Sequence, residues 1–378
     1  MLKDANWRSL HITIKSEKNN MQTKKNARLD WLKWNEQTHP IYPMFPTIFV
    51  FVIGVWVVYQ KLTLHNFDPM SFVDVDGTFV YNLAVSFPSL DAPLDVPAYR
   101  AQRILLSVLA APFGPFIPQA LIIINLLMLA LGTYILAKIG KQYRVSTLLG
   151  CVFGIWIGSL FVIQLNLTEV VAHALVLASI LAWERNKYGT SALLSGLAIL
   201  TKETTVLYAV ALLFGQHKWS YSRVFNFMLL ALGPGIIWQI VLLLQFGRLG
   251  ITAGTQSAGQ NMFPLLGLIN AKTEAPWAWG VQILWVLVPA IAAVIIGVCL
   301  LWKRTSWAVA WALVLNGLFI IVLPATSTNY LAHSMRIGLA VVVALAWVVA
   351  RSGRPRLVLL FTVLMVLPLM LFKPGFYF

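Results

Sequence analysis

Acidic residues are scarce in this chain of 378 residues, which holds only 13 Asp and Glu and is 11% charged. Soluble domains are about 25% charged and about 45–50% apolar, whereas this chain is 59% hydrophobic with a mean hydropathy of +0.77. A single soluble core cannot enclose so much apolar surface. The composition therefore excludes an ordinary soluble domain and predicts an all-α, polytopic transmembrane helical bundle.

Cysteine is almost absent as well. Cys151 and Cys299 both lie in apolar runs, where a thiol packs as a small hydrophobic side chain, so neither a disulfide framework nor a cysteine metal site is expected. The chain also lacks a phosphate-binding loop, a dinucleotide fingerprint and a nucleophile elbow. None of these common motifs therefore indicates its function.

Basic residues outnumber acidic ones, 28 to 13, which gives a formal net charge of +15. They occur in short runs between apolar stretches, the pattern of cytoplasmic loops in membrane proteins, so no nucleic-acid partner is expected. Residues 1–43 form a basic N-terminal extension, predicted to be cytosolic and a candidate docking segment for a protein partner or for membrane lipids; a solvated tail is the alternative. Residues 44–378 are predicted to form a single transmembrane domain.

Apolar stretches and two ambiguous segments predict about 10–11 membrane segments, since a span needs roughly 20 apolar residues. The stretch 104–116 is short and interrupted by prolines, and 190–214 is interrupted by polar residues at its midpoint. The nine candidate spans are 44–61, 117–138, 147–164, 168–183, 224–246, 277–301, 306–323, 336–350 and 357–372.

The stretch 190–214 decides the predicted topology, because Lys202 and Glu203 stand at its centre. If it crosses the membrane once, three later basic clusters fall outside; if it is a hairpin of two half-length helices, they fall inside. With the hairpin, 20 of the 28 basic residues lie inside and 8 outside, as the positive-inside rule requires. We therefore expect a multi-pass inner- or plasma-membrane protein with a cytoplasmic N-terminus and a broken or hairpin segment at 190–214.

The first predicted outer loop, 62–103, carries the candidate active site, because five of the 13 acids lie within 28 of its residues. In extended backbone the carboxylates of Asp74 and Asp76 point to the same side. Such a pair can hold a divalent cation, Mg²⁺ or Mn²⁺, or place a base against a hydroxyl group. The alternative is structural, with Asp76-Gly77 as a turn and aspartates as helix caps.

Candidate substrate-binding residues lie at the outer ends of the predicted spans. Arg100 and Arg103 share a helical face and can grip a phosphate; interfacial anchoring is the alternative. Lys202 at the hairpin apex suits a phosphate, oriented by Glu203, unless the two only stabilise the hairpin as an ion pair. The remaining candidates are Glu169 at the next outer turn, His333 as an acid–base group and Arg336 as a phosphate contact.

These residues resemble a family pattern. The elements of the resemblance are Asp74-Val-Asp76-Gly77 and Tyr81 in a long first outer loop, Tyr99-Arg100-x-x-Arg103 where that loop returns to the membrane, and Leu-Thr201-Lys202-Glu203 at the end of a helix of small residues. Together they resemble the GT-C class of integral-membrane glycosyltransferases, of the bacterial type. The resemblance covers, as an architecture, most of residues 44–350.

The resemblance implies an inverting transfer of a hexosyl or pentosyl group from a polyprenyl-phosphate donor on the outer, non-cytoplasmic face. Asp76 or Asp74 would then act as the base on the acceptor hydroxyl. The residues that would bind substrate are Arg100, Arg103, Lys202 and Arg336 at the lipid phosphate, with Tyr81, Glu169, Glu203 and His333 around it. No large soluble C-terminal domain for a protein acceptor is evident, which favours a lipid or glycan acceptor.

Two other functions remain open at this stage. A non-catalytic relative with the same architecture, serving as a structural or assembly subunit of a larger membrane complex, would hold its outer carboxylates in salt bridges with no cavity beside them. A secondary transporter would use the broken helix as a substrate site and would carry a matching broken segment in the other half of the chain. No internal repeat is evident in the sequence.

Overall fold

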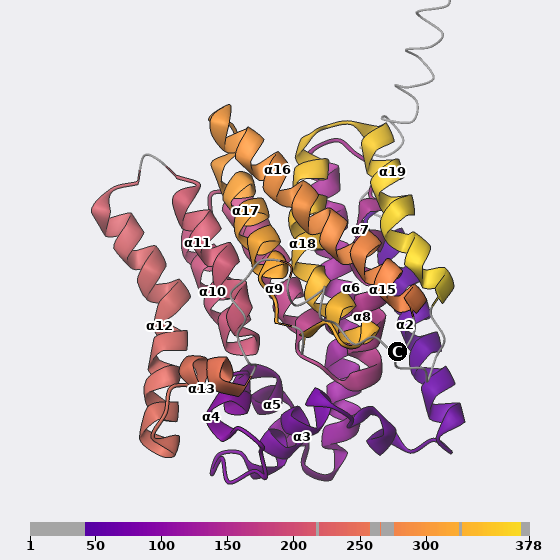
Figure 1. The fold of residues 1–378 in the computed structure, drawn as a ribbon, viewed down its shortest axis with the longest axis vertical. Coiled ribbons are helices and arrows are strands. Elements are labelled where there is room, and N and C mark those ends of the chain that lie inside the picture. Colours follow the sequence, from indigo (N-terminus) through magenta and orange to yellow (C-terminus); the bar gives the residue numbers. More distant parts are fainter. Residues whose placement is uncertain (1–41, 217–218, 258–264, 266–275, 325–326, 372–378) are drawn as a thin grey trace, which may run out of the picture.

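The protein is a bundle of helices (Figure 1). The computed structural model describes residues 42–216, 219–257, 265, 276–324 and 327–371, and all regular secondary structure in these ranges is helical. The predicted all-α helical bundle is therefore confirmed. The predicted N-terminal extension, 1–43, lies almost wholly outside the described residues.

Five helical stretches in the described part of the chain are long and apolar enough to cross a membrane, as expected of a membrane protein. They are α2 (Met44–Leu64), the stretch Ile104–Gln142 with α5 (Ile104–Ala110) and α6 (Ile117–Gln142), α12 (Tyr221–Phe246), the stretch Trp277–Trp302 with α15 (Pro276–Gln282) and α16 (Val288–Trp302), and α18 (Leu331–Arg351). The shorter apolar helices include α10 (Tyr188–Thr201), α11 (Val206–Phe214), α17 (Trp307–Ile321) and α19 (Pro355–Val366).

Helix α18 lies at the centre of the bundle and is buried along nearly its whole length. It packs against α17 and against three further helices, α7 (Leu149–Gly154), α8 (Ile157–Leu165) and α9 (Glu169–Glu184). The contact with α8 is close because Gly158 leaves no side chain there: a Cβ would lie 2.2 Å from the carbonyl oxygen of Met335. The indole of Trp156 donates a hydrogen bond to the same carbonyl at 2.9 Å, which fixes the position of α18 one residue before Arg336.

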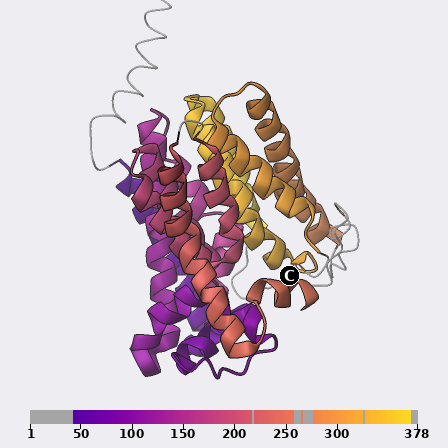
Figure 2. The same ribbon diagram turned by 90° about the vertical axis from the view of Figure 1, so that its left-hand side faces the viewer.

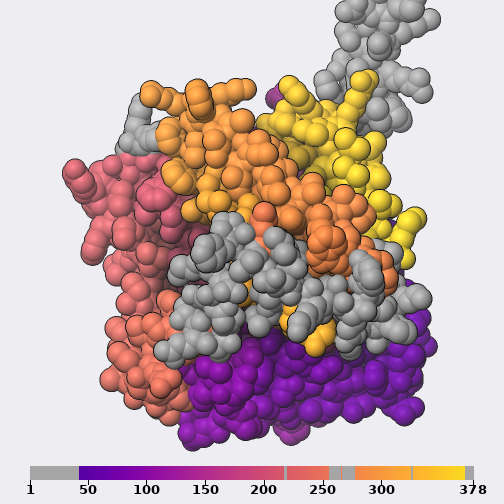
Figure 3. Space-filling view, viewed as in Figure 1, coloured from indigo at the N-terminus to yellow at the C-terminus, as the bar shows by residue number. Residues whose placement is uncertain are grey.

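The segment between α2 and α6 forms a separate layer across one end of the bundle (Figure 1). Its elements are a 3₁₀ turn (Pro69–Phe72), α3 (Asp76–Ser86), α4 (Pro97–Ala101), α5 and a second 3₁₀ turn (Ala111–Phe116). In the space-filling view these residues form a continuous band under the other helices (Figure 3). We call this the site end of the bundle, since most of the predicted active-site residues lie there.

The predicted hairpin at 190–214 is present. Helix α10 ends at Thr201, Lys202 is extended with φ −154° and ψ 118°, and a 3₁₀ turn (Glu203–Thr205) leads into α11. The ends of the two arms that lie away from Lys202-Glu203 are also close together, because the amide of Gln216 donates to the Tyr188 hydroxyl at 3.2 Å. The segment therefore begins and ends on the same side of the bundle, and Lys202-Glu203 forms its apex.

One predicted membrane segment differs from expectation, and the structure also resolves a stretch that the sequence left ambiguous. The stretch 147–164 is not one span, because an extended Trp156 (φ −54°, ψ 127°) separates α7 from α8. The ambiguous stretch 104–116 is a half-length helix, α5, joined to α6 through Gly114 at φ 51°. Both breaks place short helices inside the bundle, where neighbouring helices can satisfy the backbone groups that a break leaves unpaired.

Candidate functional site

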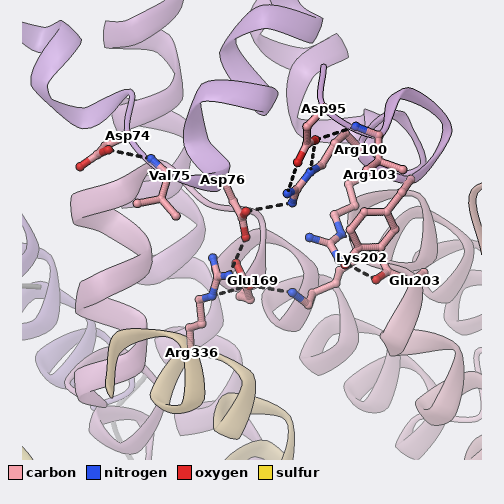
Figure 4. Close-up of polar contacts among 12 residues, drawn as sticks. Asp74, Val75, Asp76, Asp95, Arg100, Arg103, Glu169, Lys202, Glu203 and Arg336 are labelled. Atoms are coloured by element: carbon pink, nitrogen blue, oxygen red, sulfur yellow. Dashed lines mark hydrogen bonds and ion pairs between the residues drawn. The ribbon is translucent and has the colours of Figure 1, made fainter. Parts of the chain in front are cut away.

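Charged side chains from five separate segments converge where the site end meets the central helices (Figure 4). They come from the start of α3, from α4 and the second residue after it, from the start of α9, from the hairpin apex and from α18. The side chains are Asp76, Arg100, Arg103, Glu169, Lys202, Glu203 and Arg336. Seven of the ten predicted site residues therefore belong to one connected group, although up to 260 positions separate them in the sequence.

Asp76 is the centre of this group. Its Oδ1 accepts from Arg100 Nη1 at 2.9 Å and its Oδ2 accepts from Arg336 Nη2 at 2.5 Å. Burial by itself would raise the pKa of Asp76, but the charges of Arg336, Arg103 and Arg100 outweigh burial and hold its pKa well below the usual range. The carboxylate is therefore ionised at any physiological pH and is a weak base as long as both arginines stay in place.

Glu169 is the second carboxylate that Arg336 contacts. Its Oε1 lies 2.6 Å from Lys202 Nζ and 3.6 Å from Arg336 Nε, and its side chain is only 2% exposed. As the first residue of α9, it also lies where a helix favours a negative charge. Arg336 thus links the layer formed by α3 to the hairpin apex through two carboxylates.

The two arginines beside α4 have acidic partners of their own. Arg103 donates to both oxygens of Glu203, at 2.8 and 2.9 Å, and to the hydroxyl of Tyr99 at 2.9 Å. Arg100 donates to both oxygens of Asp95 at 2.9 Å, and these bonds hold the pKa of Asp95 below its ordinary value. Each cation of the group is therefore paired in this arrangement.

A cavity of about 20 Å³ lies among these side chains. That volume holds about one water molecule and is far too small for a sugar. Its walls are formed by Asp76, Phe79, Val80, Arg100, Arg103, Leu167, Thr168, Glu169 and Arg336. A ligand larger than water must therefore displace some of the charged side chains that line it.

Close packing between α3 and the end of α8 sets the position of Asp76. A Cβ on Gly77 would lie 2.0 Å from the carbonyl oxygen of Leu165, a distance that no side chain tolerates. Val75, directly before α3, has φ 50° and ψ −126°, a region that costs a β-branched residue of the order of 1–3 kcal/mol. Surrounding contacts must hold this strained turn, and it aims Asp76 at the arginines.

The same turn separates Asp74 from Asp76, contrary to the expectation that both carboxylates point to one side. Asp74 is exposed and accepts from the backbone N–H of Val75 at 2.8 Å, away from the arginines (Figure 4). Its role here is that of a turn residue, which was the structural alternative. The positive φ of Val75 is the physical reason, because the expectation assumed extended backbone on both sides.

These residues do not form a site for a resident Mg²⁺ or Mn²⁺ in this arrangement. Both oxygens of Asp76 accept from arginine, and Asp74 lies apart from it. Among the described residues, no group of three or more His, Cys, Asp or Glu side chains is placed to hold a metal ion.

Two other predicted site residues, Tyr81 and His333, form no hydrogen bond or ion pair with the charged group in the described part of the chain, although the charges of four of its members act on His333. Tyr81 packs against an apolar cluster of α3, α5 and α6. The ring of His333 meets that of Tyr330 edge-on at 5.2 Å. His173, one turn into α9, bonds to the backbone carbonyl of Glu169 at 2.8 Å and is a packed histidine. None of the three lines the small cavity.

Sequence reasoning missed two buried amides beside the site. The side chains of Gln164 and Asn166 are fully buried, and neither has a hydrogen-bond partner in the described part of the chain. Asn166 also has a left-handed backbone (φ 50°, ψ 47°) at the turn between α8 and α9. The signal was in the sequence, since asparagine is one of the few residues that adopts this conformation readily. Unpaired buried amides are costly, and they are candidates to bind water or substrate hydroxyls.

No family model matches the chain, and no curated protein or solved structure matches it either. The resemblance to the GT-C class therefore rests on the sequence motifs alone. Any function assigned to the site has to follow from its geometry and its charge.

Proposed function

We propose that this chain is an integral-membrane glycosyltransferase. It moves a sugar from a polyprenyl-phosphate donor to a lipid or glycan acceptor at the site end of the bundle, on the outer face of the membrane. One observation carries the proposal: three arginines from two distant parts of the chain surround the partly buried carboxylate of Asp76 beside a cavity. Such a group supplies both a phosphate-binding site and a base.

Arginine suits the phosphate of the donor because its planar guanidinium can donate two parallel hydrogen bonds to phosphate oxygens. Arg100 and Arg336 hold the two oxygens of Asp76 in the ligand-free arrangement. The phosphate of the sugar donor would compete with Asp76 for the N–H groups of the two arginines. Their positive charge would then stabilise that phosphate as the leaving group. Lys202 lies behind Arg336, across Glu169, and adds to the positive field.

The reaction is a displacement at the anomeric carbon of the donor. The acceptor oxygen forms a bond to that carbon while the bond from carbon to the phosphate oxygen breaks, and the electron pair of that bond goes to the lipid phosphate. The hydroxyl proton passes to the carboxylate of Asp76. Attack opposite the leaving group inverts the anomeric configuration.

Donor binding and the activation of Asp76 are coupled in this arrangement. The charges of the arginines lower the pKa of Asp76. The carboxylate is therefore a poor proton acceptor until the arginine side chains bind a phosphate instead. The small cavity likewise opens only when the arginines move away from Asp76. The donor is therefore expected to bind before the acceptor is activated.

The test compares two neighbouring carboxylates. Asp76→Asn removes the base and is expected to lower transfer by at least about 100-fold, the usual contribution of a positioned base. Asp74→Asn is the matched control, because Asp74 lies two residues away and points to solvent. The assay supplies polyprenyl-phosphate hexoses and pentoses to the purified chain with a membrane-lipid extract as acceptor. Equal activity of Asp76→Asn and the unmodified chain would refute the mechanism.

A non-catalytic structural or assembly subunit is the second candidate, and one observation favours it. Each carboxylate at the centre of the site is ion-paired, and the space between them holds only about one water. In that case the unmodified chain consumes none of the polyprenyl-phosphate sugars in the assay. Asp76→Asn then changes only stability or complex assembly. The transporter alternative has less support, since the broken segments found among the described residues, α5–α6, α7–α8 and α10–α11, all lie in the first 214 residues.

A further inference from the structure

A second, larger cavity lies at the opposite end of α10 from the charged site. Its volume is about 580 Å³, and it lies between the start of α10 and the first turns of α12. Helix α10 has 14 residues, so about 20 Å separates this cavity from the hairpin apex. On the predicted topology, this end of the bundle faces the cytoplasm.

The course of α12 explains why the cavity exists. Pro234 cannot donate the backbone hydrogen bond to Leu230, and that carbonyl packs against Gly196 of α10, where a Cβ would lie only 2.6 Å from it. The two helices are therefore in close contact at Gly196 and leave a space on the side toward Tyr188 and Arg223. Helix α12 runs along the outside of the bundle (Figure 2) and is long and apolar enough to cross a membrane.

The polar side chains that line this cavity offer hydrogen-bond donors. Arg223 is exposed and has no carboxylate partner among the described residues. The indole N–H of Trp219 is buried and finds no acceptor in the described part of the chain. Asn186 accepts from the Tyr188 hydroxyl with its oxygen, at 2.7 Å, which leaves its NH₂ group as a donor. Among the described residues, none that lines the cavity is acidic.

The rest of the wall is apolar and aromatic. Phe227, Leu229 and Leu230 of α12 line it, and the rings of Tyr188 and Trp219 meet edge-on at 5.2 Å. Tyrosine and tryptophan are enriched at the level of lipid headgroups, where one side of the ring is wet and the other is apolar. The cavity therefore combines hydrogen-bond donors that can bind an anion with an apolar surface that can contact acyl chains, both at the level of the lipid headgroups.

We propose that this cavity binds the headgroup of an anionic phospholipid. The phosphate accepts from the Arg223 guanidinium and the Trp219 indole, and the acyl chains lie along the exposed apolar face of α12. Basic pockets between transmembrane helices commonly bind anionic headgroups in this way. The site is separate from Asp76 and does not depend on the proposed transferase activity.

The test uses the purified full chain and phosphatidylglycerol, with phosphatidylcholine as the neutral comparison. Native mass spectrometry and thermal unfolding in nanodiscs are expected to show retention of phosphatidylglycerol and a higher unfolding temperature. Arg223→Gln and Trp219→Phe each remove one donor while keeping the side chain's bulk, so each is expected to weaken binding about tenfold, the equivalent of one hydrogen bond to a charged group.

Arg356→Gln is the matched control, because Arg356 is an exposed arginine of α19 near the same end of the bundle and lies outside the cavity. This variant is expected to bind phosphatidylglycerol as the unmodified chain does. Equal binding of both lipids, or equal losses in Arg223→Gln and Arg356→Gln, would show only general attraction to a basic surface and would overturn the proposal. Protection by free glycerol phosphate as strong as that by the lipid would also overturn it.

Discussion

Asp76 illustrates how far single residues can be interpreted without a structure. Its place in an acid-rich loop marked it as a candidate, because acids are rare in this chain. Its partners could not be predicted, since Arg336 lies 260 positions away. Asp74, chosen for the same reason, is a turn residue, because the positive φ of Val75 turns it from the site. Residue type predicted charge and chemistry, but side-chain direction depended on one backbone angle.

The pH dependence of stability is expected to report on Asp76. Its pKa is lower in the folded chain than in the unfolded one, so its ionised form stabilises the fold above the unfolded value, about 4, and this contribution is lost as the pH falls through the lower folded value. The contribution of Asp76 to the unfolding temperature should be constant from about pH 8 to about pH 5 and fall below about pH 4. Asp76→Asn should reduce that acid-side fall, measured by thermal unfolding in detergent; a curve unchanged from that of the unmodified chain would contradict this assignment.

Among the helices, breaks were predictable where polar residues mark them and not elsewhere. Lys202-Glu203 inside an apolar stretch predicted the hairpin, and the structure has it. The break between α7 and α8 has no such mark, because the residues around Trp156 are apolar and small. That break depends on tertiary contacts, above all the bond from Trp156 to Met335. Local sequence does not reveal contacts over 179 positions.

The position of α3 depends on a glycine whose importance only packing reveals. Gly77→Ala would place a Cβ 2.0 Å from a backbone carbonyl of α8, so α3 must shift and carry Asp76 with it. A displacement of about 1 Å typically costs about 100-fold in activity. We expect such a loss in the transfer assay, together with a lower unfolding temperature.

Gly189→Ala is the control for that variant. Gly189 is also a helical glycine, in α10, but a Cβ there meets no atom within 4 Å. Alanine favours helix over glycine by about 1 kcal/mol, so this variant should keep its activity and be as stable as the unmodified chain or slightly more so. Equal behaviour of the two variants would show that contact with α8 does not set the position of α3.

For the whole molecule, composition predicted the class and charge predicted the arrangement. The bundle is all-helical, and the loop 62–103 forms one layer at the end where the hairpin apex lies. In the described part of the chain, five stretches have the length of ordinary spans. The sequence predicted 10–11 membrane segments, and several of these are half-length helices. Hydropathy recognises an apolar stretch but not whether it is continuous. The prediction that 190–214 is a hairpin therefore had to come from the charges of the loops and not from hydropathy.

The topology itself gives the last prediction. The hairpin requires the residues on either side of 188–214 to lie on one side of the membrane and the layer of α3 to lie on the other. In a chain with Cys151 and Cys299 replaced by alanine, Ser89→Cys should react with a membrane-impermeant thiol reagent applied to the outer face of intact cells. Lys187→Cys and Ser220→Cys, both at exposed positions, should react only after permeabilisation. If Ser220→Cys reacts as Ser89→Cys does while Lys187→Cys stays protected, the segment crosses the membrane once, and the basic clusters that follow it lie outside. The positive-inside rule makes that outcome unfavourable, because it would place the arginine-rich loop 351–356 on the same face as the proposed donor site.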